Sequence, residues 1–257
     1  MPDGTVVRHS HHHHGHAHGV ETLDFAGKGV PVSDGARLVA VQRDILEKND
    51  GFAGFNRTVF EARGVLALNL ISSPGSGKTT LLVETLKRIN GSVPAMVIEG
   101  DQATDLDGAR IRATGAPAVQ VNTGKACHLD ARMVGEAAAR LNPQAGSILF
   151  IENVGNLVCP AGFDLGERSK IVLASVTEGE DKPLKYPDIF AASDLALITK
   201  TDLAEVLAFD TAALIANARR VNPSIEVIEV SARSGAGMDA WIGWLQSRLS
   251  ARARAAE

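Results

Sequence analysis

Residues 72–80 have the sequence SSPGSGKTT and lie between an apolar run and a segment of helical composition. This is the strand, loop and helix context of a Walker A phosphate-binding loop. Its glycines let backbone N–H groups curl around phosphates, its lysine can reach the outer phosphates, and the Thr79 hydroxyl can ligate Mg²⁺. We therefore predict a nucleotide-binding loop made of Gly75, Ser76, Gly77, Lys78, Thr79 and Thr80.

One position departs from the usual pattern, because Ser72 stands where the motif has its first glycine. The alternative is a glycine-rich turn that happens to precede Lys-Thr. The strand and the helix on either side favour the phosphate loop.

Apolar runs alternate with helical segments along the rest of the chain. The runs are 65–72, 95–99, 118–121, 147–152, 171–176, 195–199 and 227–231. The helical segments are 79–89, 106–113, 129–141, 204–219 and 238–252. Such alternation predicts an α/β fold of the P-loop nucleoside triphosphatase type, a doubly wound and mostly parallel sheet with helices on both faces.

The length of 257 residues is sufficient for one large domain with an appendage. Residues 1–35 lack a hydrophobic period and are expected to form a disordered, histidine-rich arm. Residues 36–62 should be a helical segment packed on the main domain, with a short helix over 36–49. Residues 63–257 should form the P-loop domain that carries both sites.

A second motif predicts the base. Residues 199–202, TKTD, follow an apolar run and resemble the [NT]-K-x-D pattern of guanine recognition. The Asp202 carboxylate offers two acceptors to guanine, whereas adenine would leave it unpaired. Lys200 would lie along the base, and Ser231 with Ala232 resembles the last guanine-contacting loop. For TKTD alone, a strand end followed by a capping aspartate is an equal alternative, but with the phosphate loop we predict GTP over ATP.

Two carboxylates are candidates for the Mg²⁺ shell beside Thr79. Asp101 follows a predicted strand and Glu152 ends one, both at the ligand-bearing edge of the sheet. Asp101 is the better candidate for orienting the attacking water, so Lys78 and Asp101 are the predicted catalytic residues. A simple helix cap is the alternative for such a carboxylate.

A transition-metal site is predicted from rare residue types. His128 is the one histidine outside the N-terminal arm, and it adjoins Cys127, one of two cysteines. Cys159 follows the next predicted strand, so two thiolates and an imidazole could converge. That donor set suits Zn²⁺ or Ni²⁺ and does not distinguish them. The alternative is a pair of half-buried thiols beside a surface histidine.

The arm contains a cluster of imidazoles that can bind Ni²⁺, Zn²⁺ or Cu²⁺ near neutral pH. Its candidate metal-storing residues are His9, His11, His12, His13, His14, His16 and His18. A purification tag is the competing interpretation, but the run is interrupted by Gly and Ala and grades into the chain.

Composition narrows the function classes. The net charge of −4 provides no basic field for nucleic acid. There is no apolar stretch of about 18 residues and no signal sequence, so neither membrane insertion nor export is expected and the protein should be cytoplasmic. Two cysteines cannot build a disulfide framework.

Together these motifs resemble the hydrogenase nickel-incorporation GTPases of the dimerising P-loop class. The resemblance spans about residues 37–244 and is most specific over 69–82, 122–131 and 151–160. It implies a GTPase that uses GTP/GDP and Mg²⁺ and holds Ni²⁺ or Zn²⁺ at Cys127, His128 and Cys159. It further implies a homodimer under GTP control, a nickel-delivery partner protein, and transfer of nickel to the hydrogenase large-subunit precursor.

Three alternatives stay open. The related urease accessory GTPase would have Cys-Pro-His as its metal motif, where this chain has Ala126-Cys127-His128 and an additional Cys159. A nickel or zinc storage protein with a structural nucleotide would show negligible turnover. A P-loop kinase would need a phosphate-acceptor pocket and usually lacks the TKTD selector.

Overall fold

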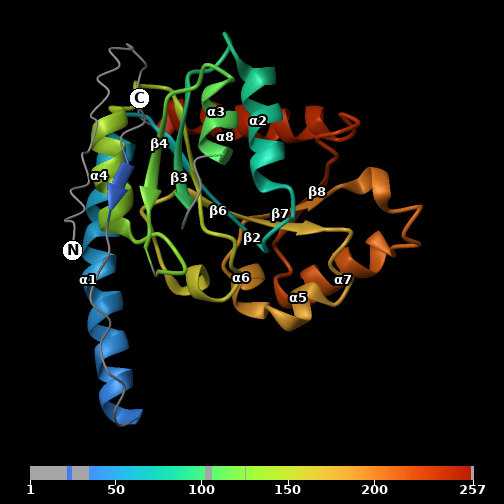
Figure 1. Cartoon of the computed structure of the whole chain (residues 1–257), viewed down its shortest axis with the longest axis horizontal. Helices are drawn as coiled ribbons and strands as arrows, with labels where there is room; N and C mark the ends of the chain where they lie inside the picture. The colour runs from blue at the N-terminus through green and yellow to red at the C-terminus, as the bar shows by residue number, and fades with distance from the viewer. Residues whose placement is uncertain (1–21, 25–34, 102–105, 125, 256–257) are drawn as a thin grey trace, which may run out of the picture.

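The computed structural model describes residues 22–24, 35–101, 106–124 and 126–255, and its centre is an eight-stranded sheet (Figure 1). The strand order is β1-β4-β3-β5-β2-β6-β7-β8, and all neighbouring strands are parallel. The strands are β1 (Thr22–Asp24), β2 (Leu66–Ser72), β3 (Ala95–Asp101), β4 (Ala118–Asn122), β5 (Ile148–Glu152), β6 (Ser169–Ser175), β7 (Leu195–Thr199) and β8 (Glu226–Glu229).

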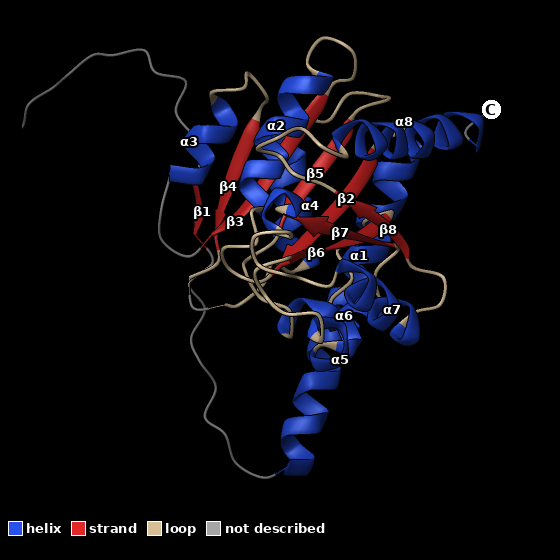
Figure 2. Cartoon of the chain, turned by 90° about the vertical axis from the view of Figure 1, so that its right-hand side faces the viewer, coloured by secondary structure: helices blue, strands red, loops and turns tan. Residues whose placement is uncertain are grey.

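Helices cover both faces of this sheet (Figure 2). They are α1 (Gly35–Ala62), α2 (Lys78–Ile89), α3 (Leu106–Arg112), α4 (Ala131–Leu141), α5 (Lys182–Lys185), α6 (Pro187–Ala191), α7 (Thr211–Val221) and α8 (Met238–Ala255), with 3₁₀ turns η1 (Cys159–Gly162) and η2 (Thr201–Leu203). The predicted doubly wound α/β fold is confirmed.

The alternation of side chains along β2 shows why the sheet has hydrophobic cores on both faces. Leu66, Leu68 and Leu70 point into a core shared with α2, α3 and α8. Ala67 and Ile71 point the other way, toward cores shared with α1 and α4 and with α6 and α7. A strand buried on both faces has a nearly continuous apolar sequence, as this one does.

Two features at the N-terminal side differ from expectation. The predicted short helix over 36–49 is part of a longer helix, α1, whose N-terminal half projects beyond the body of the protein (Figures 1 and 2). Thr22–Asp24, inside the segment expected to be disordered, pair with β4 as an edge strand. Three residues are too few to show the alternation of apolar and polar side chains that predicts a strand, so only the pairing with β4 identifies this strand.

The largest boundary error concerns the helix predicted over 204–219. Residues after η2 form turns instead, with Ala208 at φ 47°. Helix α7 begins at Thr211 because the Asp210 side chain accepts a hydrogen bond from Ala213 N at 2.9 Å and caps the helix. Likewise α4 begins at Ala131 rather than at 129, behind the capping Asp130.

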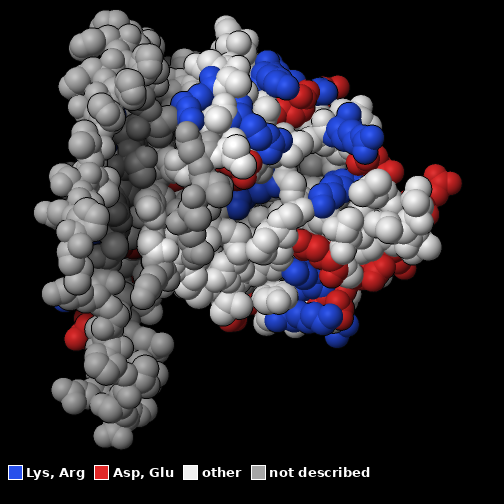
Figure 3. Space-filling view, viewed as in Figure 1, with Lys and Arg blue, Asp and Glu red and all other residues white. Residues whose placement is uncertain are grey.

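On the described part of the face in Figure 3, basic and acidic side chains are interspersed, in keeping with the small net charge. Within the described ranges, every helix is too short or too polar to span a bilayer.

Candidate nucleotide and metal site

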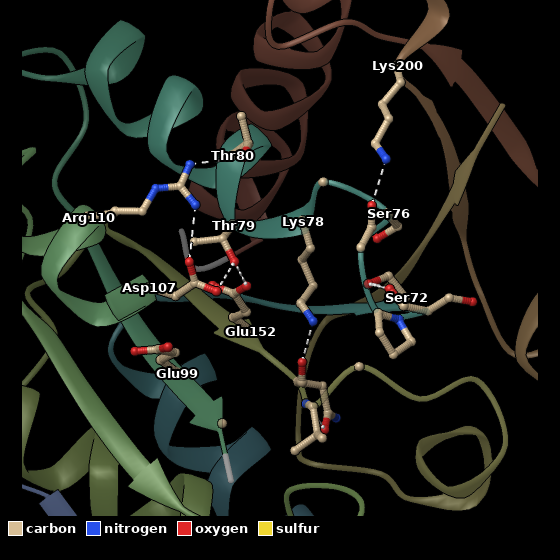
Figure 4. Close-up of a pocket in the computed structure, with 18 residues that line it drawn as sticks. Ser72, Ser76, Lys78, Thr79, Thr80, Glu99, Asp107, Arg110, Glu152 and Lys200 are labelled. Atoms are coloured by element: carbon tan, nitrogen blue, oxygen red, sulfur yellow. Dashed lines mark hydrogen bonds and ion pairs between the residues drawn. The ribbon is translucent and has the colours of Figure 1, made fainter. Parts of the chain in front are cut away.

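The phosphate loop joins the end of β2 to the start of α2, as the motif requires. Gly75 and Gly77 have φ values of 74° and 94°, a left-handed conformation that glycine adopts without steric cost. The loop lines a cavity of about 580 Å³ together with the ends of β3 and β5 (Figure 4). The α2 N-terminus adds its partial positive charge, so the cavity suits a polyphosphate.

Lys78 is the first residue of α2, and in Figure 4 its side chain points toward the segment that follows β5. Its Nζ donates to the backbone oxygen of Asn153 at 2.5 Å. The ammonium group therefore lies at the end of β5.

A cluster of oxygens surrounds Thr79. Its Oγ1 lies 2.6 Å from Oε1 of Glu152 and 3.2 Å from Oδ2 of Asp107 (Figure 4). Burial raises the pKa of the Glu152 carboxyl, and the nearby Lys78 ammonium opposes that shift. The second oxygen, Oε2, is buried without a hydrogen-bond partner in the described residues. Hydroxyl and carboxylate oxygens are the donors that Mg²⁺ prefers, so this group fits the ion.

Sequence reasoning did not select Asp107. It lies in the first turn of α3, where an acidic residue needs no explanation beyond the helix dipole, and it forms an ion pair with Arg110 at 3.1 Å. Glu99 lines the same cavity from β3, in register with Glu152. The predicted Asp101 is the last residue of β3, and its side chain lies outside the described part of the structure.

The predicted guanine-binding residues Asp202, Ser231 and Ala232 help to line a cavity of about 330 Å³ beside the phosphate loop. Asp202 Oδ1 accepts a hydrogen bond from Ser231 Oγ at 2.6 Å, which joins the two predicted guanine loops. Lys200 Nζ donates to Gly75 O at 2.7 Å, so the TKTD loop is hydrogen-bonded to the phosphate loop.

Thr199 forms a second hydrogen bond between these two loops. Its Oγ1 donates to Ser76 O at 2.7 Å. Sequence reasoning treated Thr199 only as part of the TKTD pattern, which contains no sign of this contact.

The two cysteines and His128 do converge. Their ligand atoms all lie within 4.8 Å of one another, and all three residues are half-buried. A metal with bonds of about 2.0–2.3 Å brings opposite donors to about 4.6 Å or less, so the present spacing needs only small adjustments to hold an ion. Cys127 and His128 lie in the loop after β4, and Cys159 begins η1 after β5.

The protonation of these donors follows from burial. Burial and the neighbouring Cys159 side chain raise the pKa of the Cys127 thiol to about 11. Burial lowers the pKa of His128, partly offset by Asp130, so its ring is neutral at pH 7 with a lone pair to donate. That ring also packs against Phe163, with centroids 3.9 Å apart.

The two sites share one edge because all the strands are parallel and both the phosphate loop and the metal loops follow carboxyl ends. The histidines of the arm, His9 to His18, lie outside the described residues, so their predicted role has no structural description.

Comparison with known proteins places this arrangement in a family. Residues 66–229 match the CobW/HypB/UreG nucleotide-binding domain. The chain belongs to the CobW/HypB/UreG family. The predicted resemblance is thereby confirmed, and the phosphate loop lies where that domain begins.

Relatives within this family are similar over most of the chain. The hydrogenase maturation factor HypB of Azotobacter vinelandii is 62% identical over 86% of this chain and 73% of its own length. Crystal structures of HypB from Archaeoglobus fulgidus and of HypB from Helicobacter pylori in complex with nickel are 39% and 37% identical. Each alignment has a TM-score of 0.75 and covers 79% of this chain. The alignments cover 100% of the Archaeoglobus chain and 95% of the Helicobacter chain.

Proposed function

We propose that this member of the CobW/HypB/UreG family is a GTP-hydrolysing nickel metallochaperone of [NiFe]-hydrogenase maturation. Nickel is its cargo, held by Cys127, His128 and Cys159. The family membership, the polyphosphate cavity and the converged thiols and imidazole support this proposal.

One observation carries the proposal that nucleotide controls the metal. Asn153 contacts both sites, since its backbone oxygen accepts from Lys78 and its Oδ1 accepts from Leu129 N at 3.1 Å. Leu129 adjoins His128 and is fully buried. When a phosphate takes over the Lys78 ammonium, the Asn153 carbonyl loses a charge-assisted hydrogen bond, and a shift of this peptide would be passed to Leu129 through the Asn153 side chain.

A second contact with the phosphate loop is made between Asn153 and Cys159 along the chain, at Gly155. A methyl group on Gly155 would come within 3.2 Å of the Cα of Pro74 in the phosphate loop. The backbone of the Cys159 loop therefore rests directly on the phosphate loop. A shift of either loop on nucleotide binding is expected to move the other, because close-packed segments cannot deform independently.

The remaining residues take roles that phosphoryl transfer requires. Asp202, Lys200, Ser231 and Ala232 would select guanine, and Gly75 to Thr80 would hold the phosphates. Thr79, Glu152 and Asp107 would hold Mg²⁺, whose charge compensates the phosphates. Lys78 and Asp101 would be catalytic, the first by charge and the second by orienting water.

The wider assignments follow from the same proposal. We propose a cytoplasmic homodimer that receives nickel from a delivery partner protein and passes it to the hydrogenase large-subunit precursor. The arm 1–35 would store nickel, the segment 36–62 would support the domain 63–257, and Zn²⁺ is a second ion that the site would accept. Deleting the gene should abolish hydrogenase activity and spare urease; the reverse result would favour the urease role.

The decisive experiment measures nickel affinity with a GTP analogue, with GDP and without nucleotide. We expect differences of about 5- to 150-fold, the usual range for coupled sites. Asn153→Ala should reduce those differences, whereas Asn222→Ala, which removes hydrogen bonds to carbonyls of Phe190 and Ser193 far from this edge, should not. Equal affinities in all three states of the unaltered protein would support a storage role instead.

A further inference from the structure

Helix α1 contacts both metal-binding loops through two buried asparagines. Asn49 donates from Nδ2 to Asp164 O at 2.7 Å and accepts at Oδ1 from Ala131 N at 2.9 Å. Asn56 donates from Nδ2 to Ala131 O at 2.6 Å and to Leu165 O at 3.0 Å. Each amide therefore bridges the segment just after His128 and the segment that follows Cys159.

A third side chain of α1 also contacts the segment that follows Cys159. Arg57 Nη2 lies 2.7 Å from both carboxylate oxygens of Asp164. Gly166 follows at φ 85°, and a methyl group there would lie 2.6 Å from Ala53 O in α1. The loop after Cys159 is thus closely fitted to the helix.

The phenyl ring of Phe163 connects the segment held by α1 to the proposed ligand His128. Phe163 precedes Asp164 and packs on the imidazole of His128. The loop that carries Cys159 therefore touches a ligand from the other loop, and α1 holds the next residue in place. From the other side, Ala131 begins α4 directly after the His128 segment.

We propose that Asn49 and Asn56 are positioning residues of the metal site, which fasten the Cys127–His128 loop to the Cys159 loop before metal arrives. This inference rests on the proposed function only in taking these three residues as the nickel ligands. Without the two amides, the loops would have to be ordered by the metal, and that entropy cost would weaken binding.

The chemistry of the amide explains why asparagine is needed. The Asn56 amide donates two hydrogen bonds, to carbonyl oxygens of two different loops. The Asn49 amide donates one hydrogen bond and accepts another. Both side chains are about 95% buried, so water cannot take over these bonds. Alanine at position 49 would leave Ala131 N, at the start of α4, without its partner, and alanine at position 56 would remove the donor to Ala131 O.

The test is a nickel titration of the full chain, read by the thiolate-to-nickel charge-transfer absorption. Imidazoles of the arm cannot produce that band, so it reports the cysteine site alone. Asn49→Ala and Asn56→Ala should each weaken nickel binding by about 10- to 100-fold, as seen when supporting hydrogen bonds around metal ligands are removed, and alter the band. Affinity for a GTP analogue should stay unchanged. Asn222→Ala is the matched control, expected to lower Tm and leave the band and nickel affinity intact.

Unchanged nickel affinity and absorption in folded Asn49→Ala and Asn56→Ala variants would overturn the inference. If those variants do not fold, Asn49→Asp keeps the acceptor for Ala131 N, and Arg57→Ala removes a half-exposed partner. Each should weaken nickel binding several-fold, and wild-type affinity in both would likewise overturn it. Failure of the proposed function looks different, since unaltered protein would then show no thiolate band, or the double variant Cys127→Ala with Cys159→Ala would retain it.

Discussion

The phosphate loop and the metal loops lie at the same edge of one sheet but are built in different ways. The phosphate loop is a continuous stretch whose shape comes from its own glycines, between β2 and α2. The proposed metal ligands come from two separate loops, and α1 bridges both of them with buried amides. A contiguous site depends on local backbone conformation, whereas a composite site depends on every element that holds its parts.

The two sites should therefore fail separately. A change at a metal ligand should spare the nucleotide. A change in the phosphate loop should spare metal binding when nucleotide is absent, provided that it leaves the hydrogen bond from Lys78 to Asn153 in place.

The largest effect is expected at the metal ligands. Cys159→Ala removes one of three donors and should weaken nickel binding on the order of 100-fold or more, because a few donors share a total of roughly 10–16 kcal/mol in comparable zinc sites. Competition with a chelator measures the affinity, and GTP-analogue binding should be unaffected. Loss of nucleotide binding in this variant would show that the two sites are not separately built.

A smaller effect is expected in the phosphate loop. Lys78→Ala should weaken GTP binding roughly 10- to 150-fold, since a hydrogen bond to a charged group contributes about 1.5–3 kcal/mol. Equilibrium titration with a fluorescent GTP analogue measures it. Lys87→Ala, an exposed lysine in the last turn of the same helix, is the control. Unchanged affinity in Lys78→Ala would remove the phosphate-loop assignment.

The smallest expected effect is a pH dependence that nickel binding should show and GTP binding should largely lack. The pKa of Cys127 is raised to about 11, so the thiol is protonated near pH 7 and must lose its proton to bind nickel. Apparent nickel affinity should therefore rise with pH, by about tenfold per unit for each proton released below that pKa. His128 is neutral in this range and should not add to the slope.

Titrations between about pH 7 and 8.5, on the unaltered protein and on Cys127→Ala, would measure these slopes. The variant should lose the Cys127 share of the dependence, and GTP affinity should vary far less. A flat nickel profile would contradict a thiolate ligand.

Sequence patterns predicted most of the fold and the nucleotide loop, because strand periodicity, glycine positions and motif order are local signals. They did not indicate Asp107, whose place beside Thr79 depends on how α3 packs on the sheet. They also did not indicate that Asn49 and Asn56 bridge the metal loops, because those contacts join residues distant along the chain.

The order of elements, the phosphate loop and the donor types of the metal site are therefore properties of the sequence itself. Backbone conformation within a few residues depends mainly on those residues, so such features can be predicted without the structure. The convergence of Cys127, His128 and Cys159, and the support that α1 lends them, exist only in the folded chain. Packing and hydrogen bonding between distant segments cannot be predicted from local patterns, because the sequence of one segment does not say which other segment lies beside it in the fold.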